Sequence, residues 1–492
     1  MPADAAAANG RLSTGIEGLD EVLNGGLLPR RAYMVRGEPG VGKTALGLHF
    51  LAAGRDRGER TLFLTQGTTI EALQADAGSI GIDTGGIEFV DFTPEPELFS
   101  EGQSYDVFSP LEHEREAYSA RVVETIEQLR PVRVFLDALT HGRHLSADVV
   151  DFRRQAHAFL RFLVSRGATV LFASGSSDQR SDEDLQFMSD GVLHLEYARE
   201  AGGRVLTVTK MRGSRFRLGR HSIRIADDGL HVFPRLVPEQ HGRAFVDEPI
   251  PSGIDELDAL FGGGFERGTV TMIAGPSGVG KSTLAMQFLR TSAERGERAV
   301  AYTFEESSAT IARRAAATGS PLEELFERGG LGVVEAEPLD YTPDQFALAV
   351  RREIEERGTR LVLLDSLAGY RQAIRGEDLV SQIHALCRYL RNMGVTVIVV
   401  YENNAITGDF RATELGISYL ADNIVFLRYV EVDGELRRVV GVLKKRTSDF
   451  EKAMRELTVT KDGLVIGEPM RGLRGILTGV PERRGDGAGP RP

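Results

Sequence analysis

Residues 37–44 read Gly-Glu-Pro-Gly-Val-Gly-Lys-Thr, and residues 275–282 read Gly-Pro-Ser-Gly-Val-Gly-Lys-Ser. Both match G-x-x-x-x-G-K-[ST], a loop whose backbone N–H groups surround phosphate oxygens, whose lysine reaches the terminal phosphates and whose hydroxyl ligates Mg²⁺. Each loop follows a β-forming run, residues 32–36 or 269–274, and precedes a helix-like run. The sequence therefore predicts two nucleotide sites at helix N-termini. The predicted nucleotide-binding residues are Gly40, Val41, Gly42, Lys43, Thr44, Gly278, Val279, Gly280, Lys281 and Ser282.

The two loops belong to a duplicated segment. Residues 13–20 and 252–258 share a Ser, Gly-Ile and Leu-Asp pattern, and they are separated along the chain by the same distance as the two loops. A constant separation indicates a repeated domain. Several prolines between residues 233 and 251 mark the linker. We expect two α/β domains at 1–246 and 247–480, followed by a short tail at 481–492.

Composition places the chain among globular proteins. Hydrophobic residues make up 41% and charged residues 26%. We expect a cytoplasmic protein without a membrane segment, because neither a secretory leader nor a long apolar run is present. The one cysteine, Cys387, excludes internal disulfides and lies in a helix-like run, so we interpret it as core. The net charge of −12 argues against broad nucleic-acid binding. Three interpretations of the basic stretch 210–220 stay open. It is a solvated or interface surface, a segment that contacts phosphate across a subunit boundary or, least favoured, a nucleic-acid-binding surface.

An aspartate follows a buried-strand pattern in each half. Asp137 comes after the apolar run 132–136, and Asp365 comes after 360–364. Parallel strands deliver such carboxylates to the sheet edge where ligands bind. An aspartate after a strand is also common as a turn or cap. The repeated placement favours a metal role, and we predict that Mg²⁺ is held by Thr44, Asp137, Ser282 and Asp365.

Catalytic carboxylates are predicted in the second half alone. Glu305 and Glu306 follow the strand-like run 299–304, where a carboxylate can activate a water or hydroxyl. The alternative is that two acids simply favour a helix N-terminus. In the first half, the run 61–65 is followed by Gln66-Gly67, and a glutamine orients water but cannot accept its proton. The predicted catalytic residues are Glu305, Glu306 and Asp365.

From residue 12 to residue 481, the chain resembles the KaiC family of circadian-clock ATPases and autokinases. The leader S-G-I-x-x-L-D, the two phosphate loops, the Phe-Glu-Glu and Leu-Asp-Ser strand ends and the Lys-x-Arg segments carry this resemblance. It implies two tandem RecA-like P-loop NTPase domains, each with a mostly parallel β-sheet flanked by helices. It also implies ATP and Mg²⁺ as cofactors and an ATP-dependent homo-hexamer.

The resemblance assigns further residues. Lys210 and Arg212 in one half, and Lys444 and Arg446 in the other, match the family segment that reaches the ATP of the neighbouring subunit. The family's C-terminal domain phosphorylates its own hydroxyls, and the matching candidates here are Ser418, Tyr419 and Thr413. Thr318 stands near the place of a base-stacking aromatic, and the chain has no tryptophan.

We therefore expect a KaiC-like ATPase with serine/threonine autokinase activity in the C-terminal domain. The N-terminal domain is expected mainly to bind ATP and form the ring. The implied partners are further copies of the chain and a KaiB-like protein. A KaiA-like partner is left open, because few residues follow the family's C-terminal loop. Two alternatives remain, namely a RecA- or RadA-like DNA-dependent ATPase and an ATP-gated signalling scaffold without kinase activity.

Overall fold

The computed structural model describes residues 10–91, 123–137, 149–175, 179–198, 203–337, 341–374, 379–403, 419–432, 434–471, 473–474 and 482–483. The chain divides into two compact units, residues 1–235 and 236–492. The boundary between the units comes earlier in the chain than the boundary at residue 246 that the sequence suggests, because the segment that follows Arg235 packs on the second unit. Leu236 lies in that unit's hydrophobic core, and Asn392 Nδ2 donates a hydrogen bond to Pro238 O at 2.8 Å.

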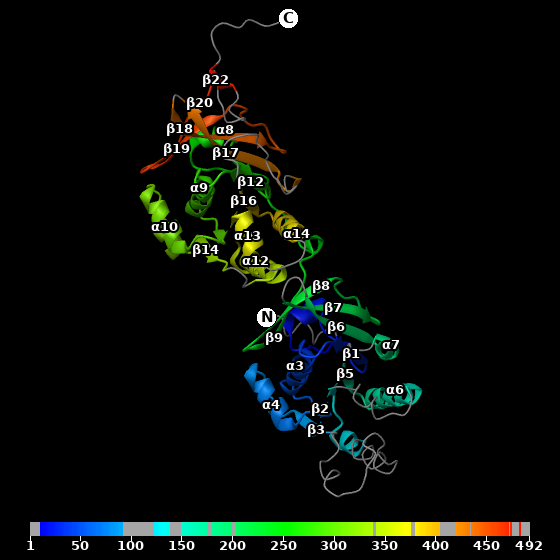
Figure 1. Cartoon of the computed structure of the whole chain (residues 1–492). Helices are drawn as coiled ribbons and strands as arrows, with labels where there is room; N and C mark the ends of the chain where they lie inside the picture. Colours follow the sequence, from blue (N-terminus) through cyan, green and yellow to red (C-terminus); the bar gives the residue numbers. More distant parts are fainter. Residues whose placement is uncertain are drawn as a thin grey trace, which may run out of the picture. The chain divides into compact units, whose positions relative to one another are not determined.

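The first unit contains a nine-stranded sheet in the order β3-β2-β4-β5-β1-β6-β7-β8-β9 (Figure 1). The pairs from β3 to β6 are parallel, and those from β6 to β9 are antiparallel. Its strands are β1 (Ala32–Gly37), β2 (Thr61–Thr65), β3 (Glu88–Asp91), β4 (Arg133–Leu136), β5 (Thr169–Gly175), β6 (Gly191–Ala198), β7 (Gly203–Met211), β8 (Arg220–Ala226) and β9 (Gly229–Phe233).

Helices cover both faces of this sheet. The helix α3, which follows the phosphate loop, packs in one hydrophobic core with β1 and β4, and α6 packs in a second core with β5. Gly47 of α3 lies directly against the Phe135 ring, where any Cβ would clash at 2.4 Å. The helices are α2 (Glu17–Val22), α3 (Lys43–Arg55), α4 (Ile70–Ser79), α6 (Val149–Ser165) and α7 (Gln179–Met188).

The second unit repeats this topology with the order β14-β13-β15-β16-β12-β17-β18-β19-β20. Parallel pairing again changes to antiparallel at one point, after β17. Its main strands are β12 (Val270–Gly275), β13 (Ala299–Thr303), β14 (Leu331–Glu335), β15 (Leu361–Asp365), β16 (Thr396–Glu402), β17 (Asn423–Val432), β18 (Glu435–Lys444), β19 (Arg455–Thr460) and β20 (Gly463–Pro469). Two-residue strands form two small antiparallel sheets, β10 (Pro249–Ile250) with β11 (Phe265–Glu266), and β21 (Leu473–Arg474) with β22 (Glu482–Arg483).

The helices of the second unit also lie on both faces of its sheet. The helix α9 packs on one face, and α12, α13 and α14 pack on the other. The helices are η3 (Pro238–Gln240), α8 (Asp255–Leu260), α9 (Lys281–Glu294), α10 (Ser308–Ala317), α11 (Glu323–Glu327), α12 (Pro343–Arg357), α13 (Leu367–Ala373) and α14 (Leu379–Asn392).

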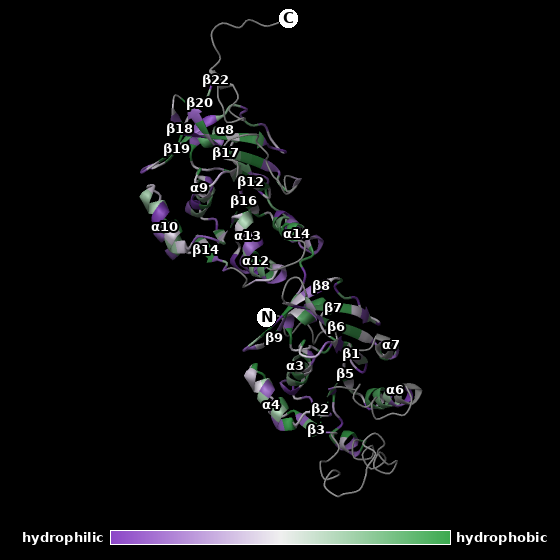
Figure 2. Cartoon of the chain, viewed as in Figure 1, coloured by the Kyte–Doolittle hydropathy of each residue, from purple (hydrophilic) through white to green (hydrophobic). Residues whose placement is uncertain are grey.

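Hydrophobic patterning explains this architecture. The central parallel strands are buried on both faces, so β2 and β13 consist wholly of buried residues. The helices are amphipathic, and Figure 2 shows mixed polar and apolar residues on α4 and α10. Two mostly parallel sheets, each flanked by helices, confirm the fold class that the sequence predicts.

Two histidines of the first unit are held neutral by burial. The His49 Nε2 atom accepts a hydrogen bond from Leu230 N at 2.8 Å, and His221 Nδ1 accepts one from Arg235 N at 3.0 Å. Burial, the largest cause, lowers the pKa of each from 6.5 to about 4. Protonation would remove the acceptor in either ring. The position of His49 in α3 is taken in α9 by Gln287, which does not titrate.

We expect the first unit to lose stability as the pH falls below 6.5. Between pH 6.5 and pH 4, these histidines bind protons in the unfolded chain but not in the folded one. The stabilisation is therefore present above pH 6.5 and fully lost below pH 4. Between pH 7 and 5, each ring costs at most about 2 kcal/mol of the unfolding free energy. Hydrogen exchange at both pH values, read separately for the two units, measures this loss. The variant His49→Gln should lose less stability over the same interval, and equal losses would contradict the assignment.

Candidate nucleotide sites

Both predicted phosphate loops connect a central strand to a helix N-terminus. In the first unit the loop joins the end of β1 to the start of α3, and in the second it joins β12 to α9. Gly42 and Gly280 precede the helices with φ values of 113° and 108°, a conformation that favours glycine. The side chains of Val41 and Val279 are fully buried, so each anchors its loop on the hydrophobic core. The geometry suits an anion at each helix start.

The loop lysines lie differently in the two units. Lys43 Nζ donates to the carbonyls of Gly37 and Glu38 at 2.8 and 2.9 Å. Lys281 Nζ donates to the Pro276 carbonyl at 2.8 Å and is only 7% exposed. These carbonyls hold the ammonium groups over the loop, where phosphate would take over as their partner.

Burial lowers the pKa of Lys281, while three nearby carboxylates oppose this shift. They belong to Glu402, Asp365 and Glu305, in order of effect. The loop of the second unit is therefore surrounded by acidic side chains from three separate strand ends. A buried lysine among carboxylates is typical of a site that handles a charged substrate.

A hydroxyl and an aspartate form the predicted metal pair in each unit. Thr44 Oγ1 donates to Asp137 Oδ2 at 3.1 Å, and Ser282 forms the equivalent hydrogen bond with Asp365. Burial, its largest influence, raises the pKa of Asp365. Oxygen ligands beside a phosphate loop are what Mg²⁺ prefers, since it is usually bound by one or two protein oxygens and by substrate phosphates. The residues of both units therefore fit Mg²⁺.

The two glutamates of the second unit have different partners. They lie in the bend between β13 and α10. Ser366 Oγ lies 3.5 Å from Glu305 Oε1, a weak hydrogen bond at the start of α13. Glu306 Oε1 instead accepts a hydrogen bond from Arg314 Nη1 at 2.6 Å, in an ion pair across the first turns of α10. Only Glu305 is among the charges that act on Lys281.

The same bend in the first unit fixes the correspondence between the halves. Thr65 Oγ1 donates to Thr68 O at 3.3 Å, and Thr303 Oγ1 donates to Glu306 O at 2.9 Å. Thr68 therefore takes the place of Glu306. Thr65 and Thr303, the last residues of β2 and β13, make equivalent hydrogen bonds and so align the two bends residue by residue.

The predicted pairing of Gln66-Gly67 with Glu305-Glu306 is thus wrong by one residue. Phe304 corresponds to Gln66, and Gly67-Thr68 corresponds to the glutamate pair. Buried Phe304 extends the apolar run past the end of β13, so the sequence pattern places the end of this strand one residue too late. The first unit still lacks a carboxylate at both positions.

Sequence reasoning missed Glu402. It ends β16 directly beside Gly275 of the phosphate loop in the register of the sheet. The matching place in the first unit is Gly175, which lies beside Gly37. The signal was present, since Glu402 follows an apolar run from residue 396 just as Asp365 follows one.

The four cations assigned to the neighbour's ATP lie against one segment in each unit. Lys210 Nζ donates to Gln186 O at 2.7 Å, and Arg212 Nη2 donates to Phe187 O at 3.4 Å. Phe187 is 72% exposed beside them. In the first unit these cations thus share a surface with an exposed aromatic.

The second unit repeats this surface. Lys444 Nζ donates to Ala421 O at 2.7 Å, and Arg446 Nη1 lies 3.6 Å from Asp422 Oδ1. Tyr419 is 55% exposed, and its ring lies 5.8 Å from that of His384. Tyr419 stands two and three residues before Ala421 and Asp422, the residues that the two cations contact. Two other predicted phosphoacceptors, Ser418 and Thr413, lie outside the described residues.

A model of the KaiC ATPase family matches residues 12–237 and 250–471. This chain belongs to the KaiC family. It is 28% identical over 488 residues to the circadian clock oscillator protein KaiC of Thermostichus vulcanus, covering 96% of this chain and 92% of that protein. It is also 28% identical over 485 residues to the circadian clock protein KaiC3 of a Synechocystis strain, covering 96% and 94%. The KaiC protein of Synechococcus elongatus is 27% identical over 488 residues, covering 96% and 92%.

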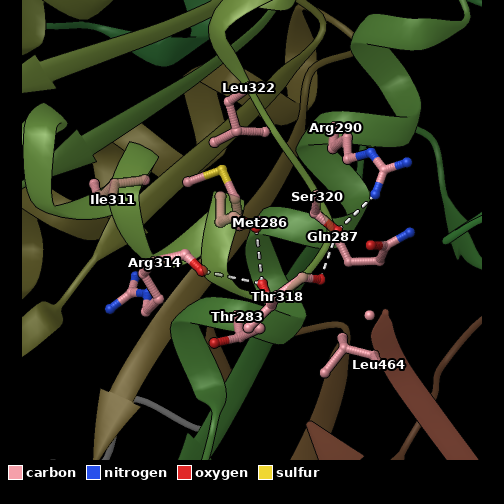
Figure 3. Close-up of a pocket in the computed structure, with 12 residues that line it drawn as sticks. Thr283, Met286, Gln287, Arg290, Ile311, Arg314, Thr318, Ser320, Leu322 and Leu464 are labelled. Atoms are coloured by element: carbon pink, nitrogen blue, oxygen red, sulfur yellow. Dashed lines mark hydrogen bonds between the residues drawn. The ribbon is translucent and has the colours of Figure 1, made fainter. Parts of the chain in front are cut away.

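In this KaiC-family chain, a pocket lies between α10 and α9, the helix that follows the second phosphate loop (Figure 3). Its walls include the apolar side chains of Met286, Ile311, Leu322 and Leu464. Thr318 lies in it, and its hydroxyl donates to the carbonyls of its own helix (Figure 3). Apolar walls with a few polar groups are typical of a small-molecule site.

The same family membership makes the chain an ATPase with two tandem domains. Among the helices that the structure describes, none has the length and apolar character of a membrane span.

Proposed function

We propose that the C-terminal domain hydrolyses ATP and transfers phosphate to a hydroxyl of this chain, while the N-terminal domain holds ATP and supports a ring. One observation carries this division of roles. The phosphate loop of the second unit is surrounded by Glu305, Asp365 and Glu402, whereas Gly67 and Gly175 take the places of the two glutamates in the first unit. The groups that bind phosphate and metal are duplicated, and the two glutamates are not.

The proposed chemistry follows from the position of each side chain. Lys281 and the loop N–H groups bind the terminal phosphates, and Ser282 with Asp365 holds Mg²⁺, which neutralises phosphate charge when bound. Glu305 accepts the proton of the attacking water or hydroxyl, because it follows β13 beside the strand that ends in Asp365 and its carboxylate contacts Ser366, the residue after Asp365. Glu306, held in an ion pair with Arg314, would support Glu305 in this role.

The pocket between α9 and α10 would take the base. The helix α9 begins at the phosphate loop with Lys281, and Thr283 and Met286 on the same helix line the pocket. A nucleotide with its phosphates on the loop can therefore place its base there. Thr318 contributes no ring for stacking, so other side chains must hold the base.

Lys444 and Arg446 would complete the site of a neighbouring copy in an ATP-dependent hexamer. In this chain they lie against the segment that contains Ala421 and Asp422. A guanidinium placed against the terminal phosphate stabilises transition-state charge. Lys210 and Arg212 would act in the same way in the N-terminal ring.

The phosphoacceptor would lie on the segment that these cations contact. Tyr419 stands three residues before Asp422, and Phe187 stands three residues before Asp190. The aspartates are equivalent, because each bonds the first residue of its central strand, Ala32 or Val270. An aromatic ring therefore occupies this position in both units, but only the second unit offers a hydroxyl.

We expect phosphate on Ser418 after incubation with ATP and Mg²⁺, with Tyr419 and Thr413 as the other candidate acceptors. The reason is that these hydroxyls come shortly before Ala421 and Asp422 in the sequence, and Lys444 and Arg446 contact those two residues. Mass spectrometry of the intact and digested protein measures the stoichiometry at each residue. Glu305→Gln serves as the control without turnover. An active ATPase that leaves all three residues unmodified would remove the kinase activity and leave an ATP-gated scaffold.

The relatives are named as clock proteins. A KaiB-like protein is therefore the partner to test first, using the ring formed in ATP.

A further inference from the structure

Arg314 of α10 links the base pocket to the catalytic carboxylates. It is part of the pocket lining (Figure 3), and its Nη1 atom donates to Glu306 Oε1 at 2.6 Å. Both side chains are about one-third exposed, 33% and 38%, so the pair lies at the edge of solvent. Arg314 is also one of the charges that lower the pKa of Asp365. One guanidinium thus acts at both ends of the candidate nucleotide site.

The rest of the pocket offers few other planar groups to a base. The Thr318 hydroxyl is used within its helix, and Met286 and Ile311 provide flexible aliphatic contacts. Arg290, the other arginine of the lining, forms an ion pair with Glu294 and donates to Ser320, farther along α9 from the loop. A guanidinium plane stacks well on nucleobases and on other π-systems.

We propose that Arg314 is a positioning and specificity residue that stacks on the nucleotide base and, through Glu306, couples base binding to the catalytic carboxylates. This inference rests on the proposed function of the second unit. A base bound against Arg314 would then influence Glu306 through their hydrogen bond, although none of the described residues that line the pocket carries an aromatic ring.

The first unit lacks this arrangement at both ends. Thr69 and Ser307 cap α4 and α10, which makes the two helices equivalent position by position. Asp76 then takes the place of Arg314, and Thr68 takes the place of Glu306. The second unit thus has both the arginine and the glutamate, and the first unit has neither, as expected if the two side chains act as a pair.

The stacking part is tested by nucleotide binding to the full chain. ATP and inorganic tripolyphosphate, which lacks a base, compete with a fluorescent ATP analogue in the binding phase that Lys281→Ala removes. For Arg314→Ala we expect roughly tenfold weaker ATP binding and unchanged tripolyphosphate binding. Arg313→Ala is the matched control, because it removes the same charge from an exposed neighbouring position of α10. Equal losses for ATP and tripolyphosphate, or no loss for either, would overturn stacking.

The coupling part is tested by turnover. For Arg314→Ala we expect kcat at saturating ATP to fall about tenfold. Arg314→Lys should recover most of kcat, since it keeps the charge beside Glu306, but little of the ATP affinity, since it lacks the plane. Arg314→Ala combined with Glu306→Gln should turn over no more slowly than Glu306→Gln alone. Independent, multiplicative losses would overturn the coupling.

The two hypotheses fail separately. A wild-type protein that binds ATP without hydrolysing it would refute the proposed function, and the comparison of ATP with tripolyphosphate would still decide the stacking role. A protein with normal turnover whose ATP affinity ignores Arg314 would refute the inference alone.

Discussion

Glu305→Gln is expected to lower ATP hydrolysis by about 10²- to 10⁴-fold while ATP binding is retained. Glutamine keeps the size of the side chain and its contact with Ser366 but cannot accept a proton. The effect is large because the first unit offers no substitute, since Gly67 takes the place of Glu305 there. Phosphate release under saturating ATP and a parallel binding titration measure the two quantities.

Glu306→Gln is the matched control for this change. Its carboxylate is engaged by Arg314, so we expect a smaller loss of turnover than for Glu305→Gln. The reverse order would assign the general base to Glu306 instead. Unchanged hydrolysis in both variants would place the chemistry elsewhere in the chain, and would remove the proposed division between the two units.

Arg446→Ala is expected to lower turnover by about 10³-fold or more, the usual effect of a transition-state arginine. The Arg446 side chain is about half exposed, and its partner Asp422 is nearly fully buried. Asp422 also accepts a hydrogen bond from Val270 N at 3.0 Å and pairs with Arg391 at 3.6 Å, so the Arg446 guanidinium can leave it for a neighbour's phosphate without stranding a buried charge. Steady-state hydrolysis and sizing in ATP measure the loss and show whether the ring persists.

Mixing two inactive variants tests whether Arg446 acts between subunits. Equimolar Glu305→Gln and Arg446→Ala chains should regain part of the activity, because some sites combine an intact Glu305 with an intact neighbouring arginine. The matched change Arg212→Ala in the first unit should leave most of the turnover. Absence of recovery in verified mixed rings would show that Arg446 acts within its own subunit or not at all.

Much of the fold was predictable because its signals are local. The phosphate loops, the strands that precede them and the strand-end aspartates are each contained in a short stretch of sequence. Repetition then linked the stretches, since a second copy at constant spacing makes chance unlikely as an explanation. For the same reason, the metal pairs Thr44 with Asp137 and Ser282 with Asp365 were predicted from sequence, and their side chains do meet.

The sequence by itself determined a doubled α/β nucleotide-binding protein with unequal halves, since motif spacing and strand patterns are properties of the chain. Tertiary structure decided which carboxylates meet. The register of β16 beside β12 brings in Glu402, the hydrogen bond of Thr303 sets the true equivalents of the glutamate pair, and α10 folds Arg314 back onto Glu306. Whether the side chains in these contacts meet depends on strand register and helix packing. A pattern read along the sequence does not give the distance between them in the fold.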